Sequence, residues 1–190
     1  MRNARNEKCQ AFLVGVSLTE VSKLIKVVSG GQTGVDQGAL RAARDSGLDI
    51  GGWCPPGAVC EAGKIPEDFL LTETPEQGSR LAPGIARSLR TEWNVRDSDA
   101  TLILKPKGPT FEDPGTECTA VFALHYLRPF RSWDPADLGV ESLVGWIRGL
   151  DLKILNVGGP SESTVPGIEA RSYNFLLRVF EQLAKPAQGK

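Results

Sequence analysis

The stretch that decides the fold is Leu24–Gly34, LIKVVSGGQTG, in which an apolar run leads directly into a glycine-rich turn. The β-branched residues of 24–29 predict a buried strand. The segment after the turn, 35–46, places alanine and leucine on one helical face, and Gly47 follows it where a helix commonly ends in a left-handed residue. The sequence therefore predicts a strand, a glycine turn and a helix, followed by a short strand over 49–52.

The same order recurs further along the chain. The additional predicted elements are strands over 100–104, 129–133 and 152–157 and helices over 84–95, 116–127, 140–150 and 167–183. Alternating strands and helices are typical of an α/β fold, in which helices cover both faces of a mostly parallel sheet. Residues 1–23 are predicted to form an N-terminal extension, and 24–185 a single ligand-binding domain.

The composition argues against several classes of protein. The chain has 190 residues, a formal net charge of -1 and no basic run, so the electrostatic footprint of a nucleic-acid-binding protein is absent. The apolar run Ala11–Val16 is far too short to span a membrane. The cysteines form no CxxC pair and His125 is the only histidine, which argues against a metal site and favours reduced thiols in a cytoplasmic protein.

The glycine-rich loops carry the predicted chemistry. Ligands of open parallel sheets bind beyond the carboxyl ends of the strands, so the loops 30–34, 108–116 and 158–163 are expected to meet at one edge. Backbone N–H groups in such loops and at helix N-termini hold phosphate without requiring net positive charge. The predicted phosphate contacts are Gly30, Gly31, Gln32, Thr33, Gly115, Thr116, Gly158, Gly159 and Ser161.

Each of these loops also has a purely structural interpretation. Thr33 and Asp36 fit a capping box at the start of a helix, and Gly115-Thr116 fits an ordinary turn into a helix. The Pro/Gly-rich stretch 53–83 is either a loop that covers the site or a packed surface loop.

Several side chains outside the loops have open roles. Either Arg90 or Asn94 reaches the ligand, or Arg90 takes part in surface ion pairs. Trp53 either forms an aromatic wall for a base or packs inside the long loop. His125 is predicted to be structural, because it lies too far along its helix to reach the loops. Asp99, just before a strand, is predicted to lie at the edge opposite the site.

Four separate stretches together resemble a known family. The strings are SGGQTGVDQGAL (29–40), GGWCP (51–55), RTEWNVRDSDATLIL (90–104) and LNVGGPSES followed by PGI (155–168). They resemble, in the same order, the putative molybdenum carrier proteins, which are also described as circularly permuted YpsA-like members of the SLOG superfamily. The resemblance implies a Rossmann-like three-layer sandwich, a homo-oligomer, and a site for a nucleotide, a nucleotide-derived ligand or molybdenum cofactor.

The superfamily also contains phosphoribohydrolases, whose PGGxGTxxE motif carries a catalytic glutamate. The stretch 114–119, PGTECT, resembles the later part of that motif and places Thr119 at the glutamate position. Threonine cannot supply a carboxylate, so the catalytic residue stays unassigned. The inserted Glu112 and Asp113 would repel phosphate unless they point away or hold a metal. The carboxylates that a hydrolase could use instead are Asp36, Glu117 and Glu162.

The sequence therefore predicts a carrier or binding protein. Its ligand would be a phosphate-bearing small molecule, held at the carboxyl edge of the sheet. The alternative is a nucleotide-processing hydrolase of the phosphoribohydrolase type. The two hypotheses differ in whether a bound nucleotide is turned over.

Overall fold

A five-stranded parallel sheet organises the molecule, whose computed structural model describes residues 24–108, 113–150 and 152–186. The strands lie in the order β2-β1-β9-β7-β8. Their bounds are β1 Lys26–Val28, β2 Asp49–Gly51, β7 Ala100–Leu104, β8 Phe130–Trp133 and β9 Ile154–Gly158. Every pairing in this sheet is parallel, so all its carboxyl ends face the same edge. The predicted extension 1–23 lies outside the described residues.

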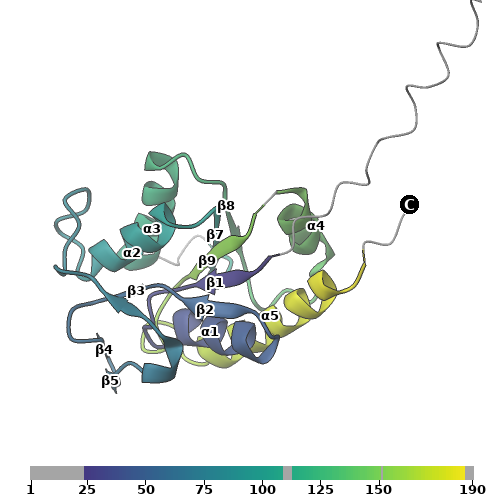
Figure 1. The fold of residues 1–190 in the computed structure, drawn as a ribbon, viewed down its shortest axis with the longest axis horizontal. Coiled ribbons are helices and arrows are strands. Elements are labelled where there is room, and N and C mark those ends of the chain that lie inside the picture. Colours follow the sequence, from purple (N-terminus) through teal and green to yellow (C-terminus); the bar gives the residue numbers. More distant parts are fainter. Residues whose placement is uncertain (1–23, 109–112, 151, 187–190) are drawn as a thin grey trace, which may run out of the picture.

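Helices cover both faces of the sheet, which makes a Rossmann-like three-layer sandwich (Figure 1). On one face lie α1 (Val35–Asp45) and α5 (Ile168–Ala184), and α4 (Glu141–Gly149) packs into the same core. On the other face lie α2 (Ser88–Arg96) and α3 (Pro114–His125). The predicted fold class is confirmed.

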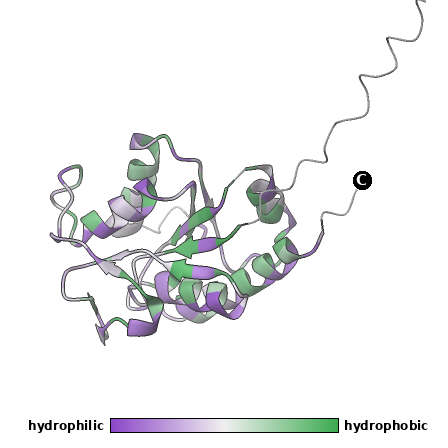
Figure 2. Cartoon of the chain, viewed as in Figure 1, coloured by the Kyte–Doolittle hydropathy of each residue, from purple (hydrophilic) through white to green (hydrophobic). Residues whose placement is uncertain are grey.

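The inner strand β7 shows why the sheet is stable. All five of its residues, ATLIL, are buried, because a parallel strand with helices on both sides has no solvent-facing row. Figure 2 shows the same pattern, with hydrophobic strands between helices whose outer faces are hydrophilic. Full burial of a leucine such as Leu102 contributes roughly 1.5–3 kcal/mol relative to exposure.

Helices α1 and α5 approach each other unusually closely. A Cβ atom on Gly38 of α1 would lie 2.6 Å from the backbone oxygen of Glu169 in α5. Only a residue without a side chain allows this separation of the two backbones. The close packing positions the start of α1 beside the start of α5, at the edge where the strands end.

The long Pro/Gly-rich stretch is folded into two small sheets. Strands β3 (Trp53–Cys54) and β6 (Thr72–Glu73) pair in parallel. Strands β4 (Val59–Cys60) and β5 (Gly63–Lys64) form an antiparallel hairpin, followed by the short 3-10 helix η1 (Glu67–Phe69). The stretch has an apolar cluster of its own, made with one residue of α1: Leu40, Cys54, Cys60, Ile65 and Phe69.

Most predicted elements agree with the structure to within a few residues, and strand 100–104 agrees at both ends. Gly47 ends α1 as expected: its φ is 74° and the following N–H, of Leu48, donates to the carbonyl of Ala43 over 3.0 Å. The helix predicted from 84 begins only at Ser88. The cause is Arg87, which takes a left-handed conformation with φ 57° and so cannot belong to the helix.

Candidate functional site

The turns that follow β1, β7 and β9 enclose a pocket of about 210 Å³ at the carboxyl edge of the sheet. These strands are neighbours in the sheet although they lie far apart in the sequence. Helix α2 and the β4–β5 hairpin complete the walls. The lining residues are Gly30, Gln32, Asp36, Glu61, Ala86, Arg87, Arg90, Thr91, Asn94, Asp113, Gly115, Thr119, Asn156, Val157, Gly158, Gly159, Ser161 and Thr164.

The structure brings most of the predicted phosphate contacts together. The predicted residues in the lining are Gly30, Gln32, Gly115, Gly158, Gly159 and Ser161. Gly31, Thr33 and Thr116 belong to the same turns but are not part of the lining. Gly31, with φ 72°, packs toward the long stretch instead, since a Cβ there would lie 2.5 Å from a methyl group of Leu71.

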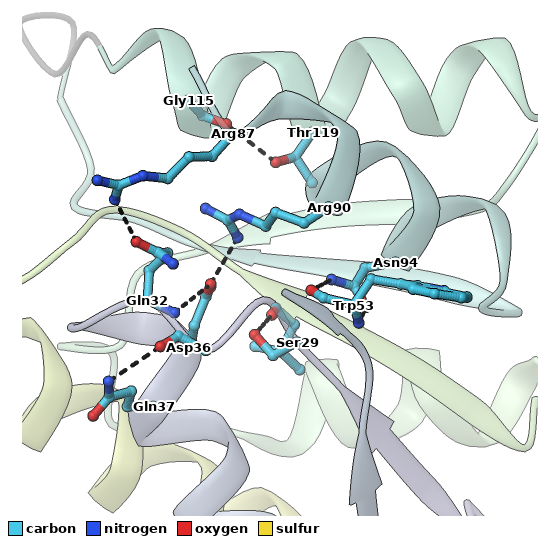
Figure 3. Close-up of polar contacts among 12 residues, drawn as sticks. Ser29, Gln32, Asp36, Gln37, Trp53, Arg87, Arg90, Asn94, Gly115 and Thr119 are labelled. Atoms are coloured by element: carbon cyan, nitrogen blue, oxygen red, sulfur yellow. Dashed lines mark hydrogen bonds and ion pairs between the residues drawn. The ribbon is translucent and has the colours of Figure 1, made fainter. Parts of the chain in front are cut away.

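A buried ion pair between Asp36 and Arg90 forms the floor of the pocket (Figure 3). Arg90 Nη1 lies 2.7 Å from Asp36 Oδ2, and the carboxylate side chain is only 2% exposed. The N–H of Gln32 donates to the same oxygen over 3.3 Å. Burial raises the pKa of Asp36, while the charge of Arg90 opposes that shift. The ion pair therefore lies in the pocket and is not the surface ion pair that the alternative interpretation of Arg90 predicted.

Two polar atoms of this ion pair have no hydrogen-bond partner among the described residues. They are Asp36 Oδ1 and Arg90 Nε. Oδ1 lies toward the third turn, 4.0 Å from where a Cβ on Gly158 would be. A Cβ on Gly30 would lie 2.1 Å from Arg90 Nη1, so glycine is needed there for the guanidinium to reach Asp36.

The predicted capping box is wrong. The N-cap residue of α1 is Gly34, and no side chain caps this end of the helix. Asp36 accepts from the N–H of Gln32 rather than from that of Thr33, because its carboxylate is drawn inward by Arg90. The hydroxyl of Thr33 donates instead to Glu61.

The second turn carries its own carboxylate. Asp113 is the N-cap of α3, and its Oδ2 accepts from the N–H of Thr116 over 3.0 Å and from its hydroxyl. Thr116 therefore takes part in capping α3, as the purely structural interpretation of this turn predicted. Glu112 lies outside the described residues. The inserted Asp113 neither points away nor joins a metal cluster, and among the described residues no such cluster was found.

The stretch 114–119, which resembles the hydrolase motif, supplies no carboxylate to the pocket. Thr119, at the glutamate position, lines the pocket, and its hydroxyl lies 3.4 Å from the carbonyl of Gly115 (Figure 3). Glu117 lies outside the lining and forms an ion pair with Lys105 at 2.6 Å. Glu162 is also outside the lining and accepts from the N–H of Glu169 over 3.0 Å at the start of α5.

Arg87 is a cation of the pocket that sequence reasoning missed. Its Nη1 donates to Gln32 Oε1 over 2.6 Å (Figure 3). The same Gln32 side chain donates to the carbonyl of Val59 over 3.0 Å. The first side chain of α2 that was expected to reach the ligand was Arg90, which lies one helical turn after Arg87. The left-handed conformation that turns Arg87 toward the pocket has no clear signature in the sequence.

Trp53 has a packing role, whereas Asn94 both holds Trp53 and lines the pocket. Asn94 clamps the backbone of Trp53, accepting from its N–H and donating to its carbonyl, both over 2.9 Å (Figure 3). The indole of Trp53 meets Trp93 edge-on, with ring centroids 4.7 Å apart, and is not in the pocket lining. Its role here is packing. His125 is exposed at the end of α3, outside the lining.

The opposite edge of the sheet also matches the prediction. Asp99 Oδ2 accepts from the N–H groups of Lys153 and Ile154, each over 2.8 Å, at the amino ends of β7 and β9.

The cysteines within the described residues, Cys54, Cys60 and Cys118, are buried and unpaired. Burial raises the pKa of Cys118 to about 11, so its thiol is not a ready nucleophile. No helix within the described ranges could cross a bilayer.

Comparison with known proteins agrees with this architecture. The model of the circularly permutated YpsA SLOG family matches residues 27–180. Among solved structures, the chain is similar to the putative molybdenum carrier protein from Syntrophus aciditrophicus SB, with 33% identity and a TM-score of 0.70 over 84% of this chain and 96% of that chain. No curated protein matches it. The family match extends from β1 into α5 and includes every turn of the pocket, and the chain therefore belongs to the circularly permutated YpsA SLOG family.

Proposed function

We propose that this protein binds a phosphate-bearing small molecule in the pocket and acts as a carrier or binding protein. The ligand classes are a nucleotide, a nucleotide-derived compound or molybdenum cofactor. The observation that carries the proposal is the meeting of three glycine-rich turns with the guanidinium groups of Arg87 and Arg90. The name of the similar structure supports the third class, since molybdenum cofactor joins a pterin to a phosphate.

The geometry of the pocket supports the binding of an anionic ligand in two ways. Gly115 lies in the first turn of α3, where backbone N–H groups have no partner within the helix and the helix dipole favours negative charge. Arg87 adds a positive charge beside this turn, whereas the charge of Arg90 is balanced by Asp36. Guanidinium groups match phosphate oxygens in a two-pronged manner. The glycines at 30 and 159 are needed for close packing, since a Cβ there would lie 2.1 Å from Arg90 Nη1 and 2.2 Å from the backbone oxygen of Leu104.

The carboxylates support binding over turnover. Of the three candidates, only Asp36 lines the pocket, and it is already paired with Arg90. Thr119 has no acid to offer, and the other carboxylates of the lining are also engaged: Glu61 with Thr33 and Ser163, and Asp113 with Thr116. We therefore place hydrolysis second, and a panel of nucleotides tested for released base or sugar phosphate distinguishes the two functions.

The experiment is a thermal-shift screen followed by titration calorimetry with nucleotides, dinucleotides and pterin phosphates. A ligand specific for the folded state raises the unfolding temperature as its concentration exceeds Kd. Arg87→Gln is expected to weaken binding of the best ligand by about tenfold, since a charge-assisted hydrogen bond contributes about 1.5–3 kcal/mol.

The matched control is Arg44→Gln, an exposed arginine paired with Asp68 outside the pocket, which should bind as the wild type does. If no member of the screen shifts the unfolding temperature, or if Arg87→Gln and Arg44→Gln behave alike, the proposed site is wrong.

The family resemblance further supports a cytoplasmic homo-oligomer, which we include in the proposal. Light scattering coupled to size-exclusion chromatography would measure the mass in solution. A mass of one chain, 20.5 kDa, at all concentrations would contradict that part.

A further inference from the structure

The hairpin of β4 and β5 contributes a carboxylate to the lining of the pocket. Glu61 and Ala62 form its turn, between the paired Cys60 and Gly63. Glu61 is exposed, yet its carboxylate joins two different glycine-rich turns. It accepts from the hydroxyl of Thr33 after β1, and from the N–H (3.1 Å) and hydroxyl of Ser163 after β9.

The groups that hold Glu61 are of the kind predicted to hold the ligand. Thr33 is itself a predicted phosphate contact. Ser161, another, has its hydroxyl 3.0 Å from that of Ser163. A backbone N–H and several hydroxyls that converge on one oxyanion suit a phosphate oxygen as well as a carboxylate oxygen. This explains why Thr33 lies in the expected turn but is itself outside the lining, with its hydroxyl bound to Glu61.

The charge of Glu61 works against an incoming anion. Hydrogen bonds from Ser163 and Thr33 hold the pKa of Glu61 below its usual value, so the group is ionised at neutral pH. A fixed negative charge in the pocket lining repels a phosphate that approaches Arg87 and Arg90. A ligand anion that replaces the Glu61 carboxylate would accept the hydrogen bonds of Thr33 and Ser163. The displaced carboxylate would then no longer repel the ligand.

The base of the hairpin is attached separately from its tip. Gln32 Nε2 donates to the carbonyl of Val59 over 3.0 Å, and Gln37 Nε2 lies 3.8 Å from Cys60 Sγ. These contacts do not involve the carboxylate. The Glu61 side chain can therefore leave Thr33 and Ser163 while the stem of the hairpin stays in place.

From these contacts we infer that Glu61 is a latch: its carboxylate occupies an oxyanion subsite made by Thr33 and Ser163, and an anionic ligand enters by exchanging with it. The inference rests on the proposed function and adds to it a subsite and a barrier to entry. An oxyanion of the ligand, phosphate before carboxylate, is the group that takes the subsite.

The test compares four proteins: the wild type, Glu61→Ala, Glu61→Gln and the control Glu67→Gln. Glu67 is an exposed carboxylate on the same long stretch but outside the pocket lining. The probe is inorganic pyrophosphate, titrated by calorimetry at neutral pH. Glu61→Ala is expected to bind it about fivefold more tightly than the wild type, Glu61→Gln to fall between them, and Glu67→Gln to match the wild type.

The outcomes separate the latch from the proposed function. Equal binding by the four proteins overturns the latch alone, and weaker binding by Glu61→Ala would mean that Glu61 holds the ligand. Absence of binding in all four overturns the latch together with the phosphate site. Hydrogen exchange at the hairpin turn, Glu61 and Ala62, gives a second readout: faster exchange in Glu61→Ala, and in the wild type with pyrophosphate, supports the latch, whereas unchanged exchange contradicts it.

Discussion

At the scale of single residues, the contact between Asp36 and Arg90 organises the site. Asp36 comes from α1 and Arg90 from α2, which lie on opposite faces of the sheet. The ion pair therefore reaches across the carboxyl edge and joins the two layers of helices. A charge pair so deeply buried is weak evidence for net stability, but breaking it leaves a buried charge without compensation.

Asp36→Asn is predicted to lower the free energy of unfolding by about 2 kcal/mol, because it leaves the mostly buried guanidinium of Arg90 without a counter-charge. Urea denaturation followed by circular dichroism measures the change. The control Asp49→Asn alters an exposed carboxylate and should stay within about 0.5 kcal/mol of the wild type. A loss for Asp36→Asn no larger than that of the control would show that the pair is not structurally important.

At the scale of elements, the helices α1 and α5 show what sequence patterns can and cannot predict. Their apolar faces predicted both helices nearly to their ends, since alanine and leucine spacing reports burial directly. The sequence did not reveal that Gly38 lies against the backbone of α5, because a glycine inside a helix has the same appearance whether its neighbour is solvent or another chain segment. Contacts between elements that are distant in sequence carry no local signal.

Gly38→Ala is predicted to destabilise the protein by about 1–3 kcal/mol, although alanine is the better helix former. The added methyl would meet the backbone oxygen of Glu169 and force α1 and α5 apart. Gly145→Ala in α4 is the control: its new Cβ has no atom within 4 Å, so helix propensity alone should raise stability by up to about 1 kcal/mol. Thermal unfolding of both variants measures the difference, and the same sign for both would refute the packing argument.

At the scale of the whole molecule, the main sheet and the small sheets over 53–73 differ in how they are stabilised. The sheet strands share one large apolar core with three helices, while the smaller cluster consists of five buried residues. The site lies where these two parts meet. The strand–turn–helix order predicted the turns of the pocket, but Arg87 and Glu61 come from the irregular part, whose path depends on packing that no periodic pattern records.

Native-state hydrogen exchange is predicted to separate the two parts. Amides of β7 and β9 should exchange only through global unfolding, because their strands are buried at the centre of the sheet. Amides of the β4–β5 hairpin should exchange at least about tenfold faster through local opening. Equal protection of the hairpin and of β7 would show that the chain unfolds as one cooperative unit and that the small sheets are no weaker than the core.

The common direction of the sheet strands has a practical consequence for experiments on immobilised protein. Each strand runs toward the pocket, and α5 begins beside the pocket and runs back, so both ends of the main described body, near 24 and 186, lie at the far side (Figure 1). A tether fixed beyond residue 186 would turn the open edge toward the bulk solution. In a binding measurement on such a surface, a dissolved ligand would reach the pocket without obstruction by the support.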